Sequence, residues 1–328
     1  MEVRDLCIHF ATEGGEVQVT NQVSFTLNAG ERVGVVGESG CGKTVTGLAL
    51  LGLLPKPPRA RVTGQILFEG RDLLQLSPRE MRKIRGRSIS MIFQEPMSAL
   101  DPVFTVGQQI AETLRTHFPI GAREARARSI DALASVGIPL PARRVDEYPH
   151  QLSGGMRQRA MIAIALACEP RLLVADEPTT ALDVTVQSQI IDLLHRLSER
   201  SGSALLFITH DLGVVAEACE RMLTMYGGQV VEDGSTDTVL EKPLHPYTSG
   251  LLRSIPRLSP RKSVLPSIRG RVPSPAEMTS GCRFAERCSH CMTGCEQPQS
   301  MAEIAGHRVR CMRHAELSLP GATEALTP

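Results

Sequence analysis

A glycine-rich loop at residues 37–44 constrains the fold of this chain more than any other part of its sequence. The loop follows the pattern G-x-x-x-x-G-K-[ST], and its residues are Gly37, Glu38, Ser39, Gly40, Cys41, Gly42, Lys43 and Thr44. An apolar run precedes it at Arg32–Val36, and a helical pattern follows at Lys43–Leu54. In that context the backbone N–H groups and the helix N-terminus face an anion. We therefore predict a nucleotide-phosphate site in which Lys43 reaches the β- and γ-phosphates and Thr44 ligates Mg²⁺.

Strand-like and helix-like segments alternate over residues 1–255, which predicts an α/β fold with a parallel sheet. Gly227-Gly228 separates the apolar segments Met222–Met225 and Gln229–Val231, so we expect a β-hairpin there. Residues 105–150 are polar with helical patterns and indicate a subdomain of their own. The other predicted strands are Ser90–Phe93, Leu172–Asp176 and Ala204–Ile208, and the other predicted helices are Gly154–Ala167 and Val186–Arg200.

Composition and charge argue against two classes of partner. The 328 residues carry a net charge of +1 and no Trp, so neither a basic surface nor aromatic stacking favours nucleic-acid binding. No apolar run reaches the roughly 18 residues that span a bilayer. The segment Met1–Phe10 has no signal-peptide core. We expect a cytoplasmic protein that reaches any membrane by docking.

Two further motifs extend the nucleotide site. The apolar run Leu172–Asp176 ends in two carboxylates, where Asp176 is placed to hold the Mg²⁺ shell and Glu177 to polarise an attacking water. Ser153 is a good helix N-cap, and Gly154 and Gly155 after it leave N–H groups open to an anion. One nucleotide does not need two phosphate-binding helix termini from one chain. We therefore predict a dimer in which residues 153–155 cover the neighbour's nucleotide.

The order of these motifs resembles the ABC ATPase cassette over residues 1–255. That resemblance implies a parallel core, an antiparallel β region and a helical subdomain at about residues 100–165. It assigns Gln94 to sensing the γ-phosphate or Mg²⁺, Asp183 of Ala181-Leu182-Asp183 to the dimer interface, and His210 to the γ-phosphate. Cassettes of this family stack adenine on an aromatic residue upstream of the phosphate loop, and Phe10 is the nearest candidate, although it equally suits a core position.

A narrower resemblance, to the ATPases of dipeptide and oligopeptide importers, covers nearly the whole chain. It is carried by residues 94–98, 148–156, 176–185 and His245-Pro246-Tyr247-Thr248. It implies an ATP-hydrolysing subunit on the cytoplasmic face of the inner membrane, with a paralogous ATPase subunit, two transmembrane permease subunits and an extracytoplasmic solute-binding protein as partners. A related branch imports nickel, which stays open as an alternative.

Five of the nine cysteines crowd into residues 282–311. A proline-rich linker at 256–281 precedes this predicted module at 282–316, and a flexible tail is expected at 317–328. Four thiolates at this spacing can bind Zn²⁺ or an iron–sulfur cluster. The importer resemblance implies a [4Fe–4S] cluster, while Zn²⁺, free thiols or disulfides stay open. The predicted ligands are Cys282, Cys288, Cys295 and Cys311, with Cys291 as a bystander or substitute.

Two other functional classes are weighed against transport. Soluble ABC ATPases that act on DNA or ribosomes tend to carry tandem cassettes or long coiled-coil insertions, and this chain has neither. An iron–sulfur regulatory protein with an incidental ATPase would not need the full set of ATPase motifs.

Cys41 lies inside the phosphate loop, beside the start of the predicted helix. A helix N-terminus can lower the pKa of a thiol and so make it more reactive. One hypothesis is that alkylation of Cys41 blocks nucleotide binding, and the alternative is that Cys41 is an inert small side chain.

Overall fold

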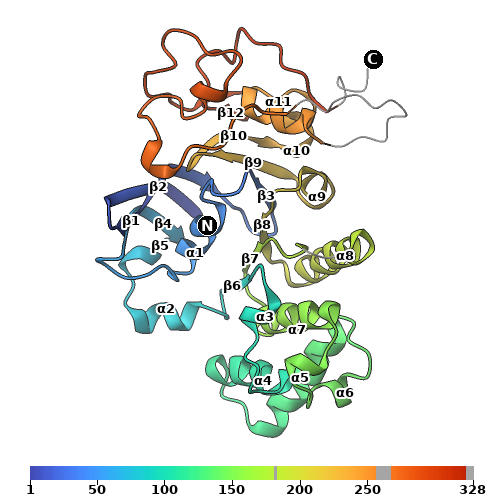
Figure 1. The fold of residues 1–328 in the computed structure, drawn as a ribbon. Coiled ribbons are helices and arrows are strands. Elements are labelled where there is room, and N and C mark those ends of the chain that lie inside the picture. The colour runs from blue at the N-terminus through green and yellow to red at the C-terminus, as the bar shows by residue number, and fades with distance from the viewer. Residues whose placement is uncertain (181–182, 256–266, 323–328) are drawn as a thin grey trace. The chain divides into compact units, whose positions relative to one another are not determined.

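The computed structural model describes residues 1–180, 183–255 and 267–322 (Figure 1). The chain divides into two compact units. The first contains Met1–Thr26, Arg32–Leu74 and the chain from Ile208 onward, and the second contains Leu27–Glu31 and Gln75–Phe207. This division does not test the predicted domain boundaries after residues 255 and 281, which stay predictions.

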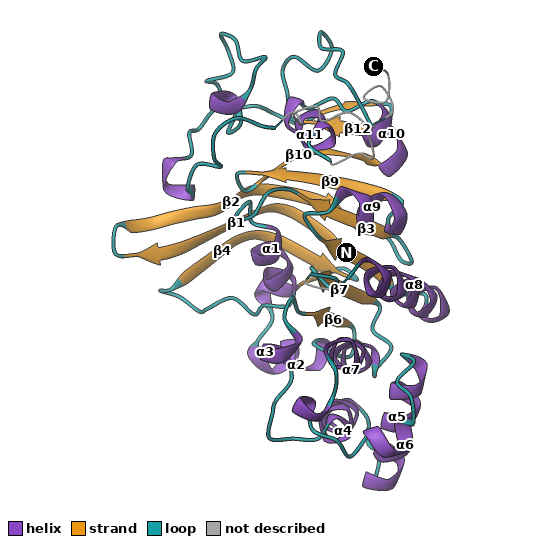
Figure 2. Ribbon diagram, turned by 45° about the vertical axis from the view of Figure 1, so that its right-hand side comes forward, coloured by secondary structure: helices purple, strands orange, loops and turns teal. Residues whose placement is uncertain are grey.

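An antiparallel sheet with the strand order β2-β1-β4-β5 belongs to the first unit. Figure 2 shows β1, β2 and β4 as long strands lying side by side. Val3, Leu6 and Ile8 of the first strand are buried, which gives this sheet an apolar face. The strands are β1 (Glu2–Thr12), β2 (Gly15–Thr26), β4 (Ala60–Phe68) and β5 (Arg71–Asp72).

The first unit also holds the strand order β11-β12-β10-β9-β3. β3 runs parallel to β9, whereas β9 and β10 form an antiparallel hairpin whose turn contains Gly227 and Gly228 at φ 52° and 78°. The predicted hairpin is therefore confirmed. The strands are β3 (Arg32–Val36), β9 (Arg221–Tyr226), β10 (Gln229–Ser235), β11 (Ala302–Ile304) and β12 (His307–Val309), and the helices are α1 (Lys43–Leu50), α9 (Leu212–Ala218), α10 (Thr236–Glu241) and α11 (Pro246–Arg253).

The second unit combines buried strands with a group of helices. β6 pairs in parallel with β7, and every residue of these two strands is buried, as expected for strands covered on both faces. Figure 1 shows α4, α5, α6 and α7 gathered together. The strands are β6 (Ile89–Ile92), β7 (Leu172–Asp176) and β8 (Ala204–Ile208, whose last residue falls in the first unit), and the helices are α2 (Pro78–Ile84), α3 (Pro96–Ala99), α4 (Val106–His117), α5 (Ala122–Ser135), α6 (Pro141–Arg144), α7 (Gly154–Leu166) and α8 (Val184–Ser201).

Local capping interactions explain where several helices begin. Thr105 and Gln108 form a capping box at the start of α4, in which each side chain bonds to the backbone of the other residue. Gly202, in the left-handed conformation at φ 66°, ends α8. Such local signals set where helices begin and end, as at the start of α4 and the end of α8.

The segment after the last cysteine makes contacts with α10 and α11 in a region that was predicted to be a flexible tail. Leu319 is buried, Ser249 Oγ donates to the Pro320 carbonyl at 2.7 Å, and the Ala322 amide donates to the Leu240 carbonyl at 2.6 Å. Within residues 317–322, the described part of the tail predicted to be flexible, these contacts hold the chain against α10 and α11. In the described parts of the chain, no helix is both long and apolar enough to cross a membrane.

Candidate nucleotide and cysteine sites

The phosphate loop connects β3 to α1 and depends on glycine at its start. Gly37 has φ 154°, and a Cβ there would lie 2.2 Å from the carbonyl oxygen of Met225, so no other residue fits without a shift. Lys43 is buried, and its Nζ donates to the carbonyls of Gly37 at 2.7 Å and Glu38 at 3.1 Å. Thr44 is exposed in the first turn of α1. The loop therefore has the curled backbone and inward lysine that phosphate binding needs.

Two other backbone segments of the first unit support this loop. A Cβ at Gly42 would lie 3.0 Å from the Thr20 side chain of β2, and the Gly228 amide donates to the Cys41 carbonyl at 3.1 Å. Phe10 lies on β1, opposite Val17 of β2, and is half-buried. Phe10 therefore lies one strand away from β2, whose Thr20 is close to the phosphate loop. Its role in stacking adenine stays a prediction.

Cys41 is fully buried, with its Sγ 3.7 Å from Lys43 Nζ. Burial raises the pKa of this thiol, and the opposing effect of the Lys43 charge is smaller. The structure therefore favours the reading of Cys41 as an inert small side chain.

In the second unit, the carboxylate after β7 meets the predicted sensing glutamine. Asp176 is 2% exposed at the end of the strand, and Glu177 follows it at φ 45°. Gln94 Nε2 donates to Glu177 Oε2 at 3.0 Å, and Thr180 Oγ1 donates to the same oxygen at 2.8 Å. The two predicted residues are thus brought together, with Thr180 as an additional partner that the motif did not indicate.

The two predicted dimer elements lie at exposed helix starts. Ser153 caps α7 by accepting from the Met156 amide at 3.4 Å, and a Cβ at Gly154 would meet no atom within 4 Å. Asp183 caps α8 by accepting from the Val186 amide at 2.9 Å. Ala181 and Leu182 lie outside the described residues. Since Ser153 and Asp183 are both exposed, each is open to a second molecule.

His210 belongs to the first unit and is exposed directly after β8. The Asp211 side chain after it accepts from the Gly213 amide at 2.8 Å and starts α9. The strand end and the helix cap together place His210 in a short turn, and its contact with a γ-phosphate stays a prediction.

The four cysteines predicted as ligands line one small cavity of about 20 Å³ in the first unit, together with apolar groups such as Phe284 and Leu317. Cys291 is exposed and does not line it. Burial, together with a smaller effect of the neighbouring thiols, raises the pKa of Cys282 and of Cys288 to about 11. None of the nine cysteines, which all lie within the described residues, forms a disulfide. No set of three His, Cys, Asp or Glu residues in the described ranges forms a group that could hold a metal ion, so a metal module is not shown.

Two residues that sequence reasoning did not single out as site residues contact the phosphate loop. The Glu38 amide donates to the Tyr247 hydroxyl at 2.8 Å, and the Arg287 guanidinium forms an ion pair with the Glu38 carboxylate at 2.6 Å. Tyr247 was part of a family string without an assigned role, and no pattern in the sequence marks Arg287.

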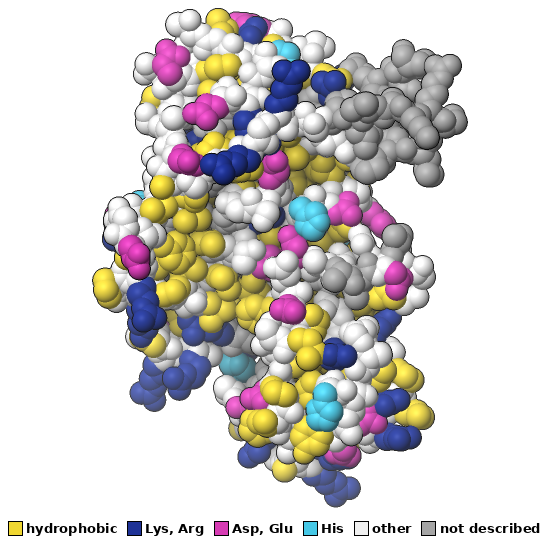
Figure 3. Space-filling view, in the orientation of Figure 1, with side chains coloured by type: hydrophobic (Ala, Val, Ile, Leu, Met, Phe, Trp, Pro, Cys, Tyr) yellow, Lys and Arg dark blue, Asp and Glu magenta, His cyan; other side chains and the backbone are white. Residues whose placement is uncertain are grey.

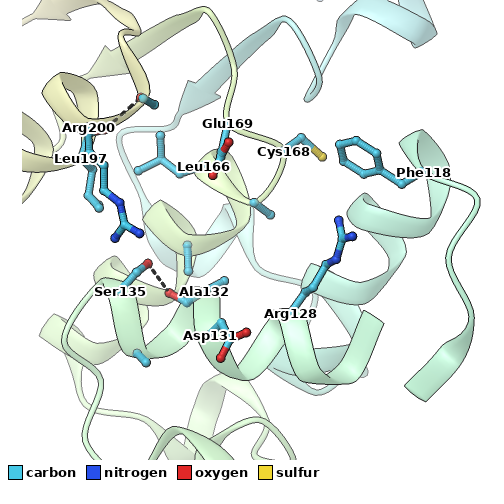
Figure 4. A pocket seen from close by; sticks show the side chains of 14 residues that line it. Phe118, Arg128, Asp131, Ala132, Ser135, Leu166, Cys168, Glu169, Leu197 and Arg200 are labelled. Carbon is cyan, nitrogen blue, oxygen red and sulfur yellow. Dashed lines mark hydrogen bonds between the residues drawn. The ribbon is translucent and has the colours of Figure 1, made fainter. Parts of the chain in front are cut away.

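A larger cavity, of about 860 Å³, lies in the second unit apart from all predicted site residues. Figure 4 shows Phe118, Arg128, Cys168 and Glu169 around it. Burial raises the pKa of Cys168 to about 11. Since no residue of the phosphate loop lines it, this cavity is not part of that loop's site.

Known proteins match nearly the whole chain, and two family models match separate parts of it. A family model described as ABC transporter matches residues 20–180, and one described as oligopeptide/dipeptide transporter, C-terminal region, matches residues 231–295. A probable peptide ABC transporter ATP-binding protein of Sinorhizobium fredii is 51% identical over 320 residues, which cover 97% of this chain and 96% of that protein. The oligopeptide transport ATP-binding protein OppD of Bacillus subtilis is 50% identical over 293 residues, covering 89% of this chain and 82% of that one.

Solved structures show the same fold over most of the chain. A dimeric structure of a bacterial ABC transporter cassette is 28% identical, with a TM-score of 0.64, and covers 72% of this chain and 98% of that one. A dimer of an ATP-binding cassette in a post-hydrolysis state, bound to ADP and Pi, has the same TM-score of 0.64 at 27% identity. The α/β cassette fold, predicted from the alternation of strands and helices and from the order of the motifs, is therefore confirmed.

Proposed function

Because the chain belongs to the ATP-binding subunits of the peptide ABC transporters, we propose that it hydrolyses ATP to power the import of di- or oligopeptides. The observation that carries this proposal is the match of residues 231–295 to the C-terminal region of oligopeptide and dipeptide transporters. That region lies outside the general cassette match and separates this branch from other ABC ATPases.

The nucleotide is proposed to lie between the phosphate loop of one cassette and residues 153–155 of another. Two observations support this: Ser153 and Gly154 are exposed at the N-terminus of α7, where backbone N–H groups favour an anion, and related cassettes form dimers. We propose a paralogous ATPase subunit as the second cassette. ATP bridges both cassettes and ADP does so poorly, so hydrolysis reopens the pair.

Each predicted residue has a defined task in hydrolysis. In this proposal Lys43 binds the β- and γ-phosphates through its ammonium group, and Thr44 and Asp176 would hold the Mg²⁺. That ion, when bound, neutralises charge on the phosphate oxygens. Glu177 orients the attacking water and accepts its proton, and His210 contacts the γ-phosphate. Gln94, hydrogen-bonded to Glu177 at 3.0 Å, positions that carboxylate.

The segment around Gln94 is suited to dock the permease subunits. Phe93, Met97, Val103 and Phe104 are large apolar side chains with 38%, 56%, 68% and 47% of their surface exposed. A group of this kind is typical of a protein-interaction site. On the face drawn in Figure 3, acidic and basic side chains are interspersed. We propose that the subunit attaches to the cytoplasmic face of the membrane through two permeases, which receive peptide from an extracytoplasmic solute-binding protein.

The cysteine-lined cavity is proposed to hold a [4Fe–4S] cluster, with Zn²⁺ as the alternative. Four thiols line one cavity, which is the number of ligands that such a cluster takes, and binding would draw them into a closer group than the structure shows. A cluster there would tie together chain segments up to 29 residues apart, from Cys282 to Cys311. Anaerobic purification followed by iron, acid-labile sulfide and zinc analysis tests this assignment. About four irons and four sulfides per chain support it, and zinc alone contradicts it.

Transport itself is tested by reconstituting the chain with its permeases and binding protein in vesicles. We expect ATP-driven uptake of a labelled dipeptide or of a longer peptide, and none with Lys43→Ala, which removes the phosphate-binding ammonium. Uptake of Ni²⁺ without peptide uptake would assign the chain to the nickel branch. ATP hydrolysis that no permease stimulates would argue against a transport role.

A further inference from the structure

The cysteine-rich segment reaches the phosphate loop through an ion pair that is largely shielded from water. Arg287 ends a short 3₁₀ turn, Ala285–Arg287, directly before Cys288. Its guanidinium donates to both carboxylate oxygens of Glu38, at 2.6 and 3.0 Å. The Arg287 side chain is 5% exposed and that of Glu38 is 31% exposed. A bidentate ion pair of this kind fixes the orientation of the Glu38 carboxylate as well as its distance from Arg287.

Arg287 is itself held rigidly in place. Its Nε donates to the Arg269 carbonyl at 2.9 Å, and its guanidinium lies over the Tyr226 ring at 5.7 Å from the centroid. Because an arginine restrained on several sides loses little freedom when it binds a carboxylate, this contact is suited to hold the Glu38 side chain in place.

The same cysteine loop supports Glu38 by a second route, through aromatic packing. Phe284 is buried against Tyr226 and Tyr247, with ring centroids 5.1 and 5.3 Å apart. Tyr247 in turn accepts a hydrogen bond from the Glu38 backbone amide at 2.8 Å. Both the backbone and the side chain of Glu38 are therefore tied to residues that touch the cysteine loop.

A third route avoids Glu38 altogether. Arg283 donates to the Gly227 carbonyl, and the adjacent Gly228 amide donates to the Cys41 carbonyl inside the phosphate loop at 3.1 Å. Residues 283, 284 and 287 thus contact the loop or its supports, while Cys282 and Cys288 on either side line the cysteine cavity.

From this geometry we propose that Arg287 is a positioning residue for nucleotide binding, which holds the phosphate loop in shape through Glu38. The loop between Cys282 and Cys288 is then a buttress of the ATP site. A change in the cysteine cavity that displaces this loop also displaces Glu38. This role concerns ATP affinity of the chain itself and stands or falls independently of the transported solute and of the metal content.

The test is MgATP binding to the full chain by isothermal titration calorimetry, with steady-state hydrolysis alongside. We expect Arg287→Met to weaken MgATP binding about tenfold and to raise KM by a similar factor, with a smaller change in kcat. Arg287→Lys keeps the charge without the fork and should restore part of the affinity. Arg308→Met is the matched control, because Arg308 pairs with Asp233 at 3.2 Å, and Asp233 keeps Arg221 as a partner at 2.7 Å.

A double-mutant cycle separates positioning from general destabilisation. Glu38→Gln and Arg287→Met should each weaken binding, and the double variant should bind no worse than the weaker single variant. Additive losses, or unchanged affinity in a folded Arg287→Met protein, would overturn the proposal. If Arg287→Met does not fold, Arg287→Lys and Glu38→Gln decide by the same comparison: wild-type affinity in both would reject the role.

Discussion

Replacing Glu177 by Gln should separate ATP binding from ATP hydrolysis. One carboxylate oxygen of Glu177 accepts from Gln94 at 3.0 Å and from Thr180 at 2.8 Å. A glutamine has the same shape and keeps one acceptor oxygen for both donors, so the local structure and the MgATP affinity should stay intact. What is lost is a group able to take a proton from water. General-base catalysis contributes about 10²- to 10⁴-fold, so kcat should fall by that factor, which corresponds to about 3–5 kcal/mol in the barrier.

The assay is single-turnover hydrolysis of radiolabelled ATP, with equilibrium binding measured on the same preparation. Glu169→Gln is a matched control, since Glu169 is an exposed glutamate with a similar backbone conformation, φ 50° against 45° for Glu177. It should hydrolyse ATP at the normal rate. If Glu177→Gln turned over ATP as fast as this control, or lost MgATP binding together with turnover, the assigned role would be wrong.

Three further perturbations test other parts of the chain. Glu232 is fully buried, accepts from two backbone amides and contacts His307 at 2.8 Å, so Glu232→Leu should lower the free energy of unfolding by about 3–5 kcal/mol; a loss below about 1 kcal/mol in urea titrations would contradict this. Burial lowers the pKa of His245 to about 3. Below about pH 6.5 the unfolded chain therefore binds a proton at His245 that the folded chain does not bind. The free energy of unfolding should fall by about 1.4 kcal/mol per pH unit as the pH drops from about 6.5 towards 3. His245→Asn, which keeps the helix cap, should flatten that slope, and an unchanged slope would exclude His245 as its cause. Cys41 should react with iodoacetamide far more slowly than exposed Cys291, with or without MgATP, as read by mass spectrometry; fast labelling that MgATP blocks would revive the reactive-thiol hypothesis.

Three almost entirely buried strands could be predicted with their bounds, whereas β6 lies one residue before the predicted Ser90–Phe93, and the half-exposed β1 and β2 could not be predicted. β3, β7 and β8 have the predicted bounds because each is a continuous apolar run between polar turns. β1 and β2 were not assigned individually. Their pairing has register shifts between Val3 and Leu6 and between Leu6 and Ile8, and these irregularities break the alternation that marks a strand. The helix of the phosphate loop ends at Leu50, four residues early, because Gly52 is left-handed at φ 59°.

The same distinction between local and distant signals holds for the nucleotide site. The phosphate loop, the carboxylates after β7 and the start of α7 are contiguous motifs, and each adopts the local structure its residues predict. Tyr247 and Arg287 lie 209 and 249 residues beyond Glu38 in the chain. No spacing rule connects positions that far apart, since only the folded sheet and the cysteine loop bring them together.

The pairing of β12 with β10 has a consequence for how this protein behaves when shortened. Glu232 lies opposite Val309, Asp233 lies opposite Arg308, and the Arg310 amide donates to the Val231 carbonyl at 2.8 Å. The cysteine-rich segment therefore covers an edge of the sheet that would otherwise present unpaired N–H and C=O groups to other molecules. A chain cut before Cys282 would expose that edge along a strand whose residues from Gln229 to Gly234 are all buried. We expect such a fragment to self-associate through β-strand pairing, which the full chain avoids by covering this edge with β12.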